Sequence, residues 1–246
     1  MIDVVYPLGR GSKWGNAEIR YSLRSIEKYS LEDGYRVFVV GEKPACLDWN
    51  KVGHIPFTET KAKEINILEK ALAAAKDERV SDEFFFINDD YFFLNPFSMK
   101  EFPYYHKGNI RTQPWGKKPD KEIRHVYDRM VKMTADVLEK DGFGTFHYDI
   151  HTPHRLLKRW VIAAYEQYKN VLPRTERGMA CLTTILNHAC VAGTHKTDTK
   201  LHGKDLDWLK KNKGKELMFS IFDTAQIPEF RAYMDKLYPE KSYFEA

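Results

Sequence analysis

The triplet Asn88-Asp89-Asp90 contains the side chains of this sequence that are best suited to chemistry. Two adjacent carboxylates repel each other when both are ionised, and a divalent cation removes that repulsion. Hard oxygen ligands suit Mg²⁺ or Mn²⁺, which also bridge the phosphates of a nucleotide diphosphate. Carboxylates that cap a surface turn are the alternative, because Asp is common in turns. The apolar runs on both sides, 84–87 and 91–94, favour a metal site at Asp89 and Asp90, with Asn88 against the bound nucleotide.

Two histidines flank a proline in His151-Thr152-Pro153-His154, where we predict that a helix begins. Imidazole transfers protons near neutral pH and also ligates metals, so His151 and His154 are candidate general bases. One histidine that caps the helix and another that is exposed to solvent would be the alternative. His202-Gly203-Lys204 is a weaker case of the same kind, since His202 could complete a metal shell and Lys204 could contact a diphosphate. A surface loop explains that segment equally well.

A glycine-rich loop and two arginines add possible anion-binding groups. The loop at 7–15 matches neither the dinucleotide fingerprint nor the Walker motif. If Asn16 is the N-cap of the helix that follows, the loop would present backbone amides and Arg20 to an anion, although a flexible loop explains the glycines equally well. Arg174 and Arg177 precede another predicted helix and could bind phosphate, although solvated arginines are the commoner outcome.

Short β-branched and aromatic runs predict the strands that position these groups. We expect strands at 2–6, 36–41, 52–57 and 83–87, a helix from Asn16 onward and another at 61–76. This alternation predicts a mostly parallel α/β sheet flanked by helices. Ligands bind beyond the carboxyl ends of the strands in such sheets. The first and fourth strands therefore direct the glycine-rich loop and Asn88-Asp89-Asp90 to the same edge.

The second half of the chain is more helical. We predict helices at 121–140, just after His154, at 178–189 and at 228–237, with a short strand at 219–222. The chain thus divides into an α/β core at 1–120 and a mainly helical part at 121–246, which we expect to pack together as one structural domain.

Composition excludes some functional classes. The 246 residues carry a net charge of +4, which is less basic than a dedicated nucleic-acid binder and compatible with an anionic ligand. Three cysteines without metal-ligand spacing indicate reduced thiols rather than a disulfide framework. The basic stretch 210–215 is typical of a solvated loop. Since no apolar run is long enough to span a bilayer and no secretion signal is evident, we expect a soluble, cytoplasmic protein.

Several segments resemble one known family in the order in which they occur. Ile2 to Tyr6 with Gly11-Ser12, Asn16 to Tyr29, Phe86 to Phe92, and His151 to His154 resemble the conserved regions of Stealth-type sugar-phosphotransferases. That resemblance implies a GT-A-like, Rossmann-like nucleotide-sugar fold, a divalent cation at Asp89 and Asp90, and catalytic use of His151 or His154. His202-Gly203-Lys204 is also similar to the late metal-ligand histidine segment of some retaining GT-A glycosyltransferases.

One departure from the family bears on the group that is transferred. The first family motif usually reads Trp-Val-Asp-Gly-Ser-Asp, whereas residues 7–13 lack those acidic residues and the chain is short. Both sugar transfer and sugar-1-phosphate transfer therefore remain open.

The sequence thus predicts a metal-dependent transferase, using Mn²⁺ or Mg²⁺, that moves a sugar or sugar-1-phosphate from a nucleotide-diphosphate sugar to a hydroxyl of a glycan or another acceptor. A glycosyltransferase acting on a hydroxylated nucleic-acid base and a non-catalytic nucleotide-sugar-binding module are the alternatives. The assigned residues are His151, His154 and Arg177 for catalysis, Asp89, Asp90 and His202 for the metal, and Pro7, Leu8, Gly9, Ser12, Asn16, Arg20, Asn88 and Lys204 for the nucleotide-sugar.

Overall fold

A mostly parallel sheet organises the molecule. The computed structural model describes residues 2–60, 62–172 and 177–246, and within them five strands pair in the order β3-β2-β1-β4-β7. β1 is parallel to β2 and β4, β2 is parallel to β3, and only the edge strand β7 is antiparallel. The predicted α/β class is therefore confirmed. The strands span Ile2–Leu8 (β1), Tyr35–Gly41 (β2), Val52–Ile55 (β3), Glu83–Phe86 (β4) and His154–Leu157 (β7).

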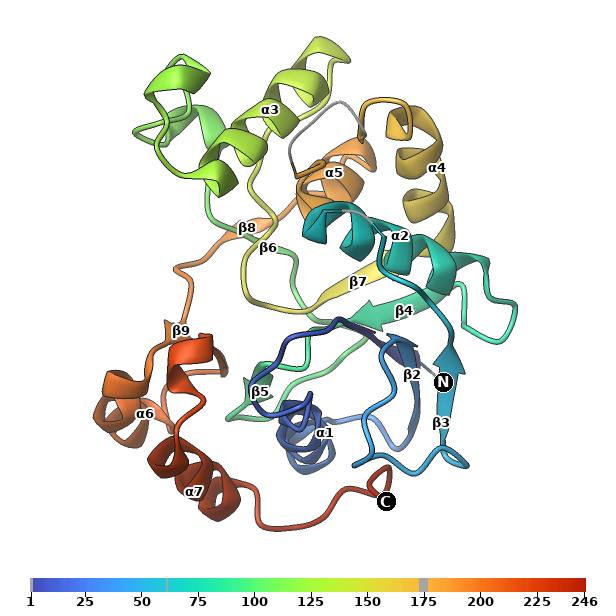
Figure 1. The fold of residues 1–246 in the computed structure, drawn as a ribbon, viewed down its shortest axis with the longest axis vertical. Coiled ribbons are helices and arrows are strands. Elements are labelled where there is room, and N and C mark those ends of the chain that lie inside the picture. Colours follow the sequence, from blue (N-terminus) through green and yellow to red (C-terminus); the bar gives the residue numbers. More distant parts are fainter. Residues whose placement is uncertain (1, 61, 173–176) are drawn as a thin grey trace.

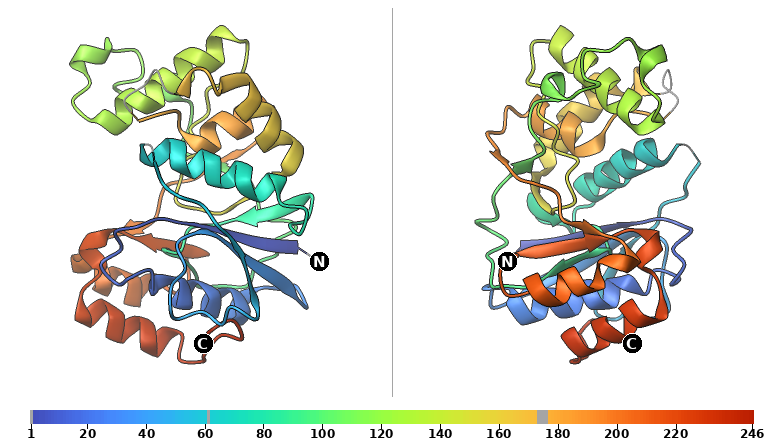
Figure 2. Two further views of the ribbon diagram at one scale, coloured as in Figure 1. Left: turned by 45° about the vertical axis from the view of Figure 1, so that its right-hand side comes forward. Right: turned by 90° about the vertical axis from the view of Figure 1, so that its left-hand side faces the viewer.

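Successive side chains of each strand point to opposite faces of the sheet, and each face has its own apolar core. Val5 and Phe86 belong to one core, and Val4 and Phe85 belong to the other. Helices lie over both faces, so the sheet lies between helical layers (Figures 1 and 2). The first layer consists of α2 (Lys63–Lys76), α4 (Lys158–Tyr168) and α5 (Cys181–His188), and the second begins with α1 (Glu18–Tyr29).

A smaller sheet brings the end of the chain back to the side of α1. β10 pairs with β5 and with β9, and Phe92, Phe219 and Phe230 form a core there with Tyr21 of α1. The helices at 126–140 and 181–188 lie on the opposite side, above α2 in Figure 1. The elements of this part are β5 (Tyr91–Phe93), β9 (Lys200–Leu201), β10 (Met218–Ile221), α6 (Leu206–Asn212) and α7 (Pro228–Leu237).

The remaining described elements complete the upper layer and the connections. α3 (Val126–Lys140) packs through Met130 and Val131 against Ala180, beside α5. A two-stranded pair of β6 (Tyr105–His106) and β8 (Thr194–His195) links the upper layer to the rest, and short 3-10 turns lie at Ile110–Thr112, Asp120–Glu122, Gly203–Asp205 and Asp223–Ala225.

Two predicted helix starts are wrong. No helix begins at His151-Thr152-Pro153-His154, because His154–Leu157 forms β7 and pairs with β4, and α4 starts only at Lys158. Asn16 is not the N-cap of α1. Its φ is +60°, a left-handed conformation that Asn tolerates, and Ala17 takes the N-cap position.

Other predicted elements are confirmed with shifted ends. The predicted helix at 61–76 is α2, whose proposed first residue, Lys61, lies outside the described residues. The predicted helix at 121–140 starts at Val126, after a 3-10 turn at Asp120–Glu122. The final helix, Pro228–Leu237, agrees with the prediction.

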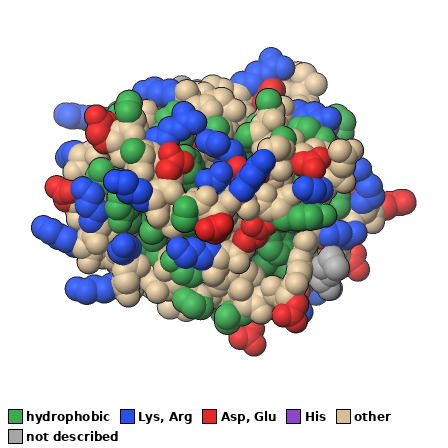
Figure 3. Space-filling view, turned by 90° about the horizontal axis from the view of Figure 1, so that it is seen from below, with side chains coloured by type: hydrophobic (Ala, Val, Ile, Leu, Met, Phe, Trp, Pro, Cys, Tyr) green, Lys and Arg blue, Asp and Glu red, His purple; other side chains and the backbone are tan. Residues whose placement is uncertain are grey.

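The basic stretch 210–215 is partly helical, because α6 extends to Asn212. Seen from below, Lys and Arg side chains gather over the side formed by α6 and α7 (Figure 3). Within the described ranges, every helix is too short or too polar to cross a bilayer.

Candidate active site

The candidate site lies where the order of strand addition reverses in the sheet. β2 and β3 extend from one side of β1 and β4 extends from the other, which makes the β1–β4 boundary a topological switch point. Ligands of open α/β sheets bind beyond the strand ends at such a point. A cavity of about 590 Å³ opens there and is lined by both strand ends. The predicted site residues among its lining are Pro7, Gly9, Ser12, Asn16, Asn88, Asp89, Asp90, His151 and Arg177.

The loop after β1 forms one wall and is held by its own side chains. Asn16 donates from Nδ2 to the carbonyl oxygen of Gly9 at 3.0 Å. Ser12 donates from Oγ to Glu18 Oε1 at 2.5 Å, and Gln226 also donates to that oxygen. Glu18 is buried, and its other oxygen, Oε2, has no hydrogen-bond partner among the described residues. The loop therefore holds a buried carboxylate at the cavity instead of presenting only backbone amides.

Three carboxylates crowd the end of β4. Burial raises the pKa of Asp89 well above its ordinary value, and the negative charges of Asp90 and Glu18 raise it further. Burial likewise raises the pKa of Glu18, and its hydrogen bond from Ser12 opposes that shift. Asp90 Oδ1 is buried without a hydrogen-bond partner among the described residues. A positive charge placed here would lower the electrostatic energy of all three groups.

Lys200 supplies one positive charge to this group. Its Nζ lies 3.5 Å from Asp90 Oδ2 and also lies over the ring of Phe222, 4.8 Å from the ring centre. Lys200 lines the cavity and comes from β9, far from β4 in the sequence. Because the lysine follows no recognisable motif, nothing in the sequence links it to Asp90.

The donor atoms suit a hard divalent cation, but His202 does not take part. Asp89 and Asp90 offer oxygen ligands, and the unpartnered Asp90 Oδ1 has free coordinating capacity. His202 lies outside the cavity, bonds Thr224 Oγ1 through Nδ1 at 2.8 Å and stacks on Phe222 at 4.1 Å between ring centres. In the described ranges no three His, Cys, Asp or Glu side chains form a cluster able to hold a metal ion. Water or ligand oxygens would therefore have to complete the coordination.

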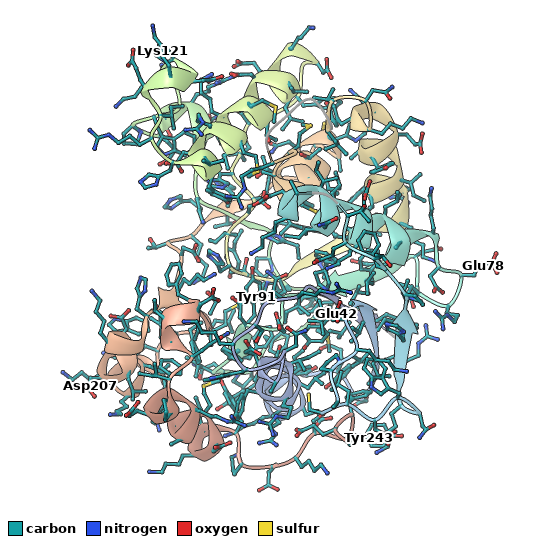
Figure 4. The ribbon with its side chains drawn as sticks, viewed as in Figure 1. Glu42, Glu78, Tyr91, Lys121, Asp207 and Tyr243 are labelled. Atoms are coloured by element: carbon teal, nitrogen blue, oxygen red, sulfur yellow. The ribbon has the colours of Figure 1, made fainter. Side chains whose placement is uncertain are left out.

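His151 borders the cavity and has a fixed orientation. Its Nδ1 lies 2.5 Å from Asp198 Oδ2, and its backbone N–H donates to Asp198 Oδ1 at 3.3 Å. Tyr91 lies edge-on to the imidazole, with ring centres 6.2 Å apart. Figure 4 labels Tyr91 between the lower layer and the helices above it, at the level of the cavity. The structure thus places one predicted histidine at the site.

His154 occupies a different environment. Its side chain is fully buried in β7, where it stacks near Tyr104 and lies edge-on to Tyr148, and it does not line the cavity. Burial lowers the pKa of His154 to about 3, although the backbone of Tyr148 favours the protonated ring slightly. A ring without access to the cavity cannot take a proton from an acceptor there, so this placement argues against a role as general base.

Arg177 lines the cavity but already has an anionic partner. Its guanidinium forms two bonds with the buried carboxylate of Glu64, from Nε to Oε2 at 3.0 Å and from Nη2 to Oε1 at 2.6 Å. Such a paired fork is a strong, rigid interaction. Arg174, the second arginine proposed for phosphate, lies outside the described residues.

Three other predicted donor-binding residues lie outside the cavity lining. Leu8 is buried in the core, Lys204 is exposed, and Arg20 donates to the carbonyl oxygen of Ala17 at 3.4 Å. Leu8 still affects the cavity indirectly, because its carbonyl oxygen accepts a bond from the buried Lys70 at 2.6 Å. The prediction that Arg20 binds donor phosphates gains no support from its position.

The cavity also contains charged residues that sequence reasoning missed. The complete cavity lining contains seven carboxylates and five Lys and Arg side chains, so the formal charge of the lining is negative. Among the carboxylates, Asp149 accepts bonds from the backbone N–H groups of Leu182 and Thr183 at the start of α5. Lys63 and Lys70 follow the helical pattern of α2 and showed no separate signal. The missed lining residues with polar side chains are Arg10, Glu18, Glu59, Lys63, Glu64, Asn66, Lys70, Tyr91, Tyr127, Asp149, Lys200, Asp223 and Gln226.

One short segment contacts both sides of the cavity. Residues 198–200 form the end of the connection from β8 to β9 and the first residue of β9. This connection descends from the upper layer to the small sheet (Figure 1). Asp198 holds His151, and Lys200 pairs with Asp90. Between them, the carbonyl oxygen of Thr199 accepts the N–H of Ser220 in β10 at 2.9 Å. The segment therefore joins the histidine and the acidic group through one stretch of backbone.

No protein-family model and no curated protein sequence matches this chain, so membership of the Stealth family is not confirmed. A crystal structure of the galactosyltransferase LgtC in complex with donor and acceptor sugar analogs is similar, with a TM-score of 0.50 and 12% sequence identity over 98% of this chain and 96% of that chain. An active-site mutant of LgtC aligns with a TM-score of 0.48 and 10% identity over 96% and 95% of the two chains. The first likeness confirms the predicted GT-A-like α/β fold.

Proposed function

We propose that this protein is a glycosyltransferase that moves a sugar from a nucleotide-diphosphate sugar to an acceptor hydroxyl. The observation that carries the proposal is the crowded acidic group at the β1–β4 switch point, which opens into a cavity of about 590 Å³. Sites of this volume accommodate small-molecule ligands. The fold adds support, since LgtC, the similar protein, is a galactosyltransferase.

The donor diphosphate would lie beside the acidic pair. Asp89 and Asp90 would hold a divalent cation, which when bound neutralises charge on the diphosphate as it departs. Lys200, whose partner Asp90 belongs to the acidic pair itself, and the exposed Lys63 are the cavity cations placed to share that task. The other cavity cations, Arg10, Lys70 and Arg177, pair with Glu42, Glu59 and Glu64. Burial and the negative charges of Asp90 and Glu18 raise the pKa of Asp89, and a cation bound between the carboxylates would lower that pKa again.

The acceptor hydroxyl would be activated by His151. The oxygen of the acceptor hydroxyl forms a bond to the anomeric carbon of the donor sugar. The bond from that carbon to the diphosphate oxygen breaks, and its electron pair leaves with the nucleoside diphosphate. The hydroxyl proton passes to His151 Nε2, the ring nitrogen that does not bond Asp198. His151 is the only one of the two proposed histidines in the described cavity lining, so we assign the base to it alone.

The test is a donor screen followed by product analysis. The protein is incubated with UDP-glucose, UDP-galactose, UDP-N-acetylglucosamine or GDP-mannose, each with and without MnCl₂, and the released nucleotide is identified. Nucleoside diphosphate is expected. Nucleoside monophosphate would instead show sugar-1-phosphate transfer, and donor-induced thermal stabilisation without turnover would show a non-catalytic binding module.

Asp89→Asn is the matched variant for this screen. We expect it to abolish Mn²⁺-dependent turnover and donor binding while folding is retained, because removal of one carboxylate relieves the repulsion among Asp89, Asp90 and Glu18. Asp207→Asn, on exposed α6 and outside the cavity, is the control. Full activity of Asp89→Asn would contradict the metal assignment. A nucleic-acid acceptor gains no support from the similar LgtC structure, which contains donor and acceptor sugar analogs.

A further inference from the structure

Asp198 holds His151 through both of its carboxylate oxygens. Oδ2 lies 2.5 Å from the ring Nδ1, and Oδ1 accepts the backbone N–H of the same residue at 3.3 Å. The side chain thereby fixes the position of both the backbone and the ring. Tyr91 and Phe222 border the imidazole, with ring centres 6.2 and 6.5 Å away, and limit its rotation.

An ionised carboxylate can only accept hydrogen bonds, so this contact determines the tautomer. Nδ1 must carry the proton that Asp198 accepts, which leaves the lone pair of a neutral ring on Nε2. No hydrogen-bond partner of Nε2 occurs among the described residues, and His151 lines the cavity. The free lone pair is therefore available to a hydroxyl that enters the cavity.

Lys107 keeps Asp198 in the ionised form. Its Nζ lies 2.9 Å from the same Oδ2 that meets His151. Burial alone would raise the pKa of Asp198, but its hydrogen bond from His151 and the positive charge and hydrogen bond of Lys107 act against burial and lower that pKa well below its ordinary value. Asp198 therefore remains an acceptor over the pH range in which a neutral histidine could act as a base.

We propose that Asp198, held by Lys107, is a positioning residue that fixes His151 in the tautomer with Nδ1 protonated and so directs Nε2 as the base toward the acceptor hydroxyl. The catalytic half of this proposal rests on the proposed transferase function. The structural half, the tautomer of His151, does not. Asp198 lies 47 positions from His151 in the sequence, and neither residue type nor spacing indicated the pair.

The structural half is tested by ¹⁵N NMR of the histidine side chains in the full-length protein at a pH where His151 is neutral, with His151→Gln used to assign its signals. We expect the Nδ1-protonated form in the wild type. In Asp198→Asn, the amide N–H can donate to Nδ1 and move the proton to Nε2, so a changed tautomer or a mixture is expected. An Nε2-protonated ring in the wild type, or an unchanged tautomer in Asp198→Asn, would overturn the proposal.

The catalytic half is tested by turnover of the donor found in the screen. Asp198→Asn should lower kcat by roughly a hundredfold or more, the scale of losing a well-placed general base, while the donor KM stays close to that of the wild type. Asp198→Glu, which keeps the carboxylate, should recover part of kcat. Asp207→Asn is the charge-matched control on α6, far from the cavity (Figure 4).

The two halves fail separately. If the wild type turns over no donor, the proposed function fails and the NMR result still decides whether Asp198 fixes His151. If turnover is found but Asp198→Asn keeps a kcat within a few-fold of the wild type, the positioning role is refuted and the proposed function stands. A parallel loss in Asp198→Asn and Asp198→Glu, with a lowered melting temperature, would reduce Asp198 to a structural residue.

Discussion

Replacement of Lys200 by methionine should strengthen Mn²⁺ binding to the protein about tenfold at low ionic strength. Lys200 Nζ lies 3.5 Å from Asp90 Oδ2 and is the cation nearest to that carboxylate among the described residues. A divalent cation bound by Asp89 and Asp90 would have to displace this ammonium or sit beside it. Methionine keeps the length and apolar character of the stem, so the change removes mainly the charge.

The magnitude follows from the distance and the exposure. At 3.5 Å, two unit charges attract by about 1 kcal/mol in water and by about 5 kcal/mol at an effective dielectric constant near 20. The side chains of Lys200 and Asp90 are only 18% and 21% exposed, so solvent screens the pair little. Because a bound cation can lie beside the ammonium without breaking the whole pair, only a part of this attraction opposes Mn²⁺ binding, and we take the lower end of the range. A difference of about 1.4 kcal/mol corresponds to a tenfold change in affinity.

Isothermal titration of MnCl₂ into the protein without nucleotide measures this change directly. Lys204→Met is the matched control, because Lys204 is exposed and lies outside the cavity lining. The gain in Lys200→Met should shrink as salt is added, since screening weakens the competing ion pair. If Lys200→Met binds Mn²⁺ no better than Lys204→Met, then Lys200 does not compete for the acidic group and the electrostatic account of the site is wrong.

Two further predictions concern stability. His154 has a pKa lowered to about 3 by burial, so the wild type should lose up to about 1.4 kcal/mol of stability per pH unit as the pH falls from about 6.5, the unfolded value, toward 3, whereas His154→Leu should lack this component. Denaturant unfolding at several pH values measures it, and a pH-independent difference between the two proteins would contradict it. Arg177→Met should cost about 1 to 3 kcal/mol by leaving buried Glu64 unpaired, and Glu64→Gln in addition should recover part of that loss. Strictly additive losses in the double variant would show that the pair is not coupled.

The fold could be predicted largely because its signals are local. The strands at the centre of the sheet are short apolar runs, and the acidic pair directly follows one of them, so the parallel α/β class and the edge that holds the site could be predicted together. His154 was misplaced because Leu156, Leu157 and Trp160 have helical spacing. β7 exists through long-range pairing with β4, which a local pattern does not contain.

The partners of the predicted site residues could not be predicted for the same reason. Asp198, Lys107 and Lys200 have no motif around them. Lys200 reaches the cavity because β9 pairs with β10 and β10 pairs with β5. Lys107 meets Asp198 because it follows β6, whose partner strand β8 precedes Asp198. The conformation of Asn16 could not be predicted because its residue type is compatible with two local structures. Its residue type fits both an N-cap and a left-handed turn, and the hydrogen bond to Gly9, which only the folded loop provides, accompanies the second.

The segment 198–200 makes the site sensitive to strand register. Asp198 and Lys200 are two positions apart, and their placement depends on the pairing of β9 with β10, in which Ser220 is the partner of Lys200 and Thr199 accepts the Ser220 N–H. A shift of one residue in this pairing would place neighbouring side chains at both positions at once. Deletion or insertion of a single residue between Lys196 and Asp198 falls outside the paired strands β8 and β9, but the same change between Asp198 and Leu201 would separate His151 from its carboxylate or Asp90 from its ammonium. The length of this short segment is therefore under tighter constraint than its composition suggests.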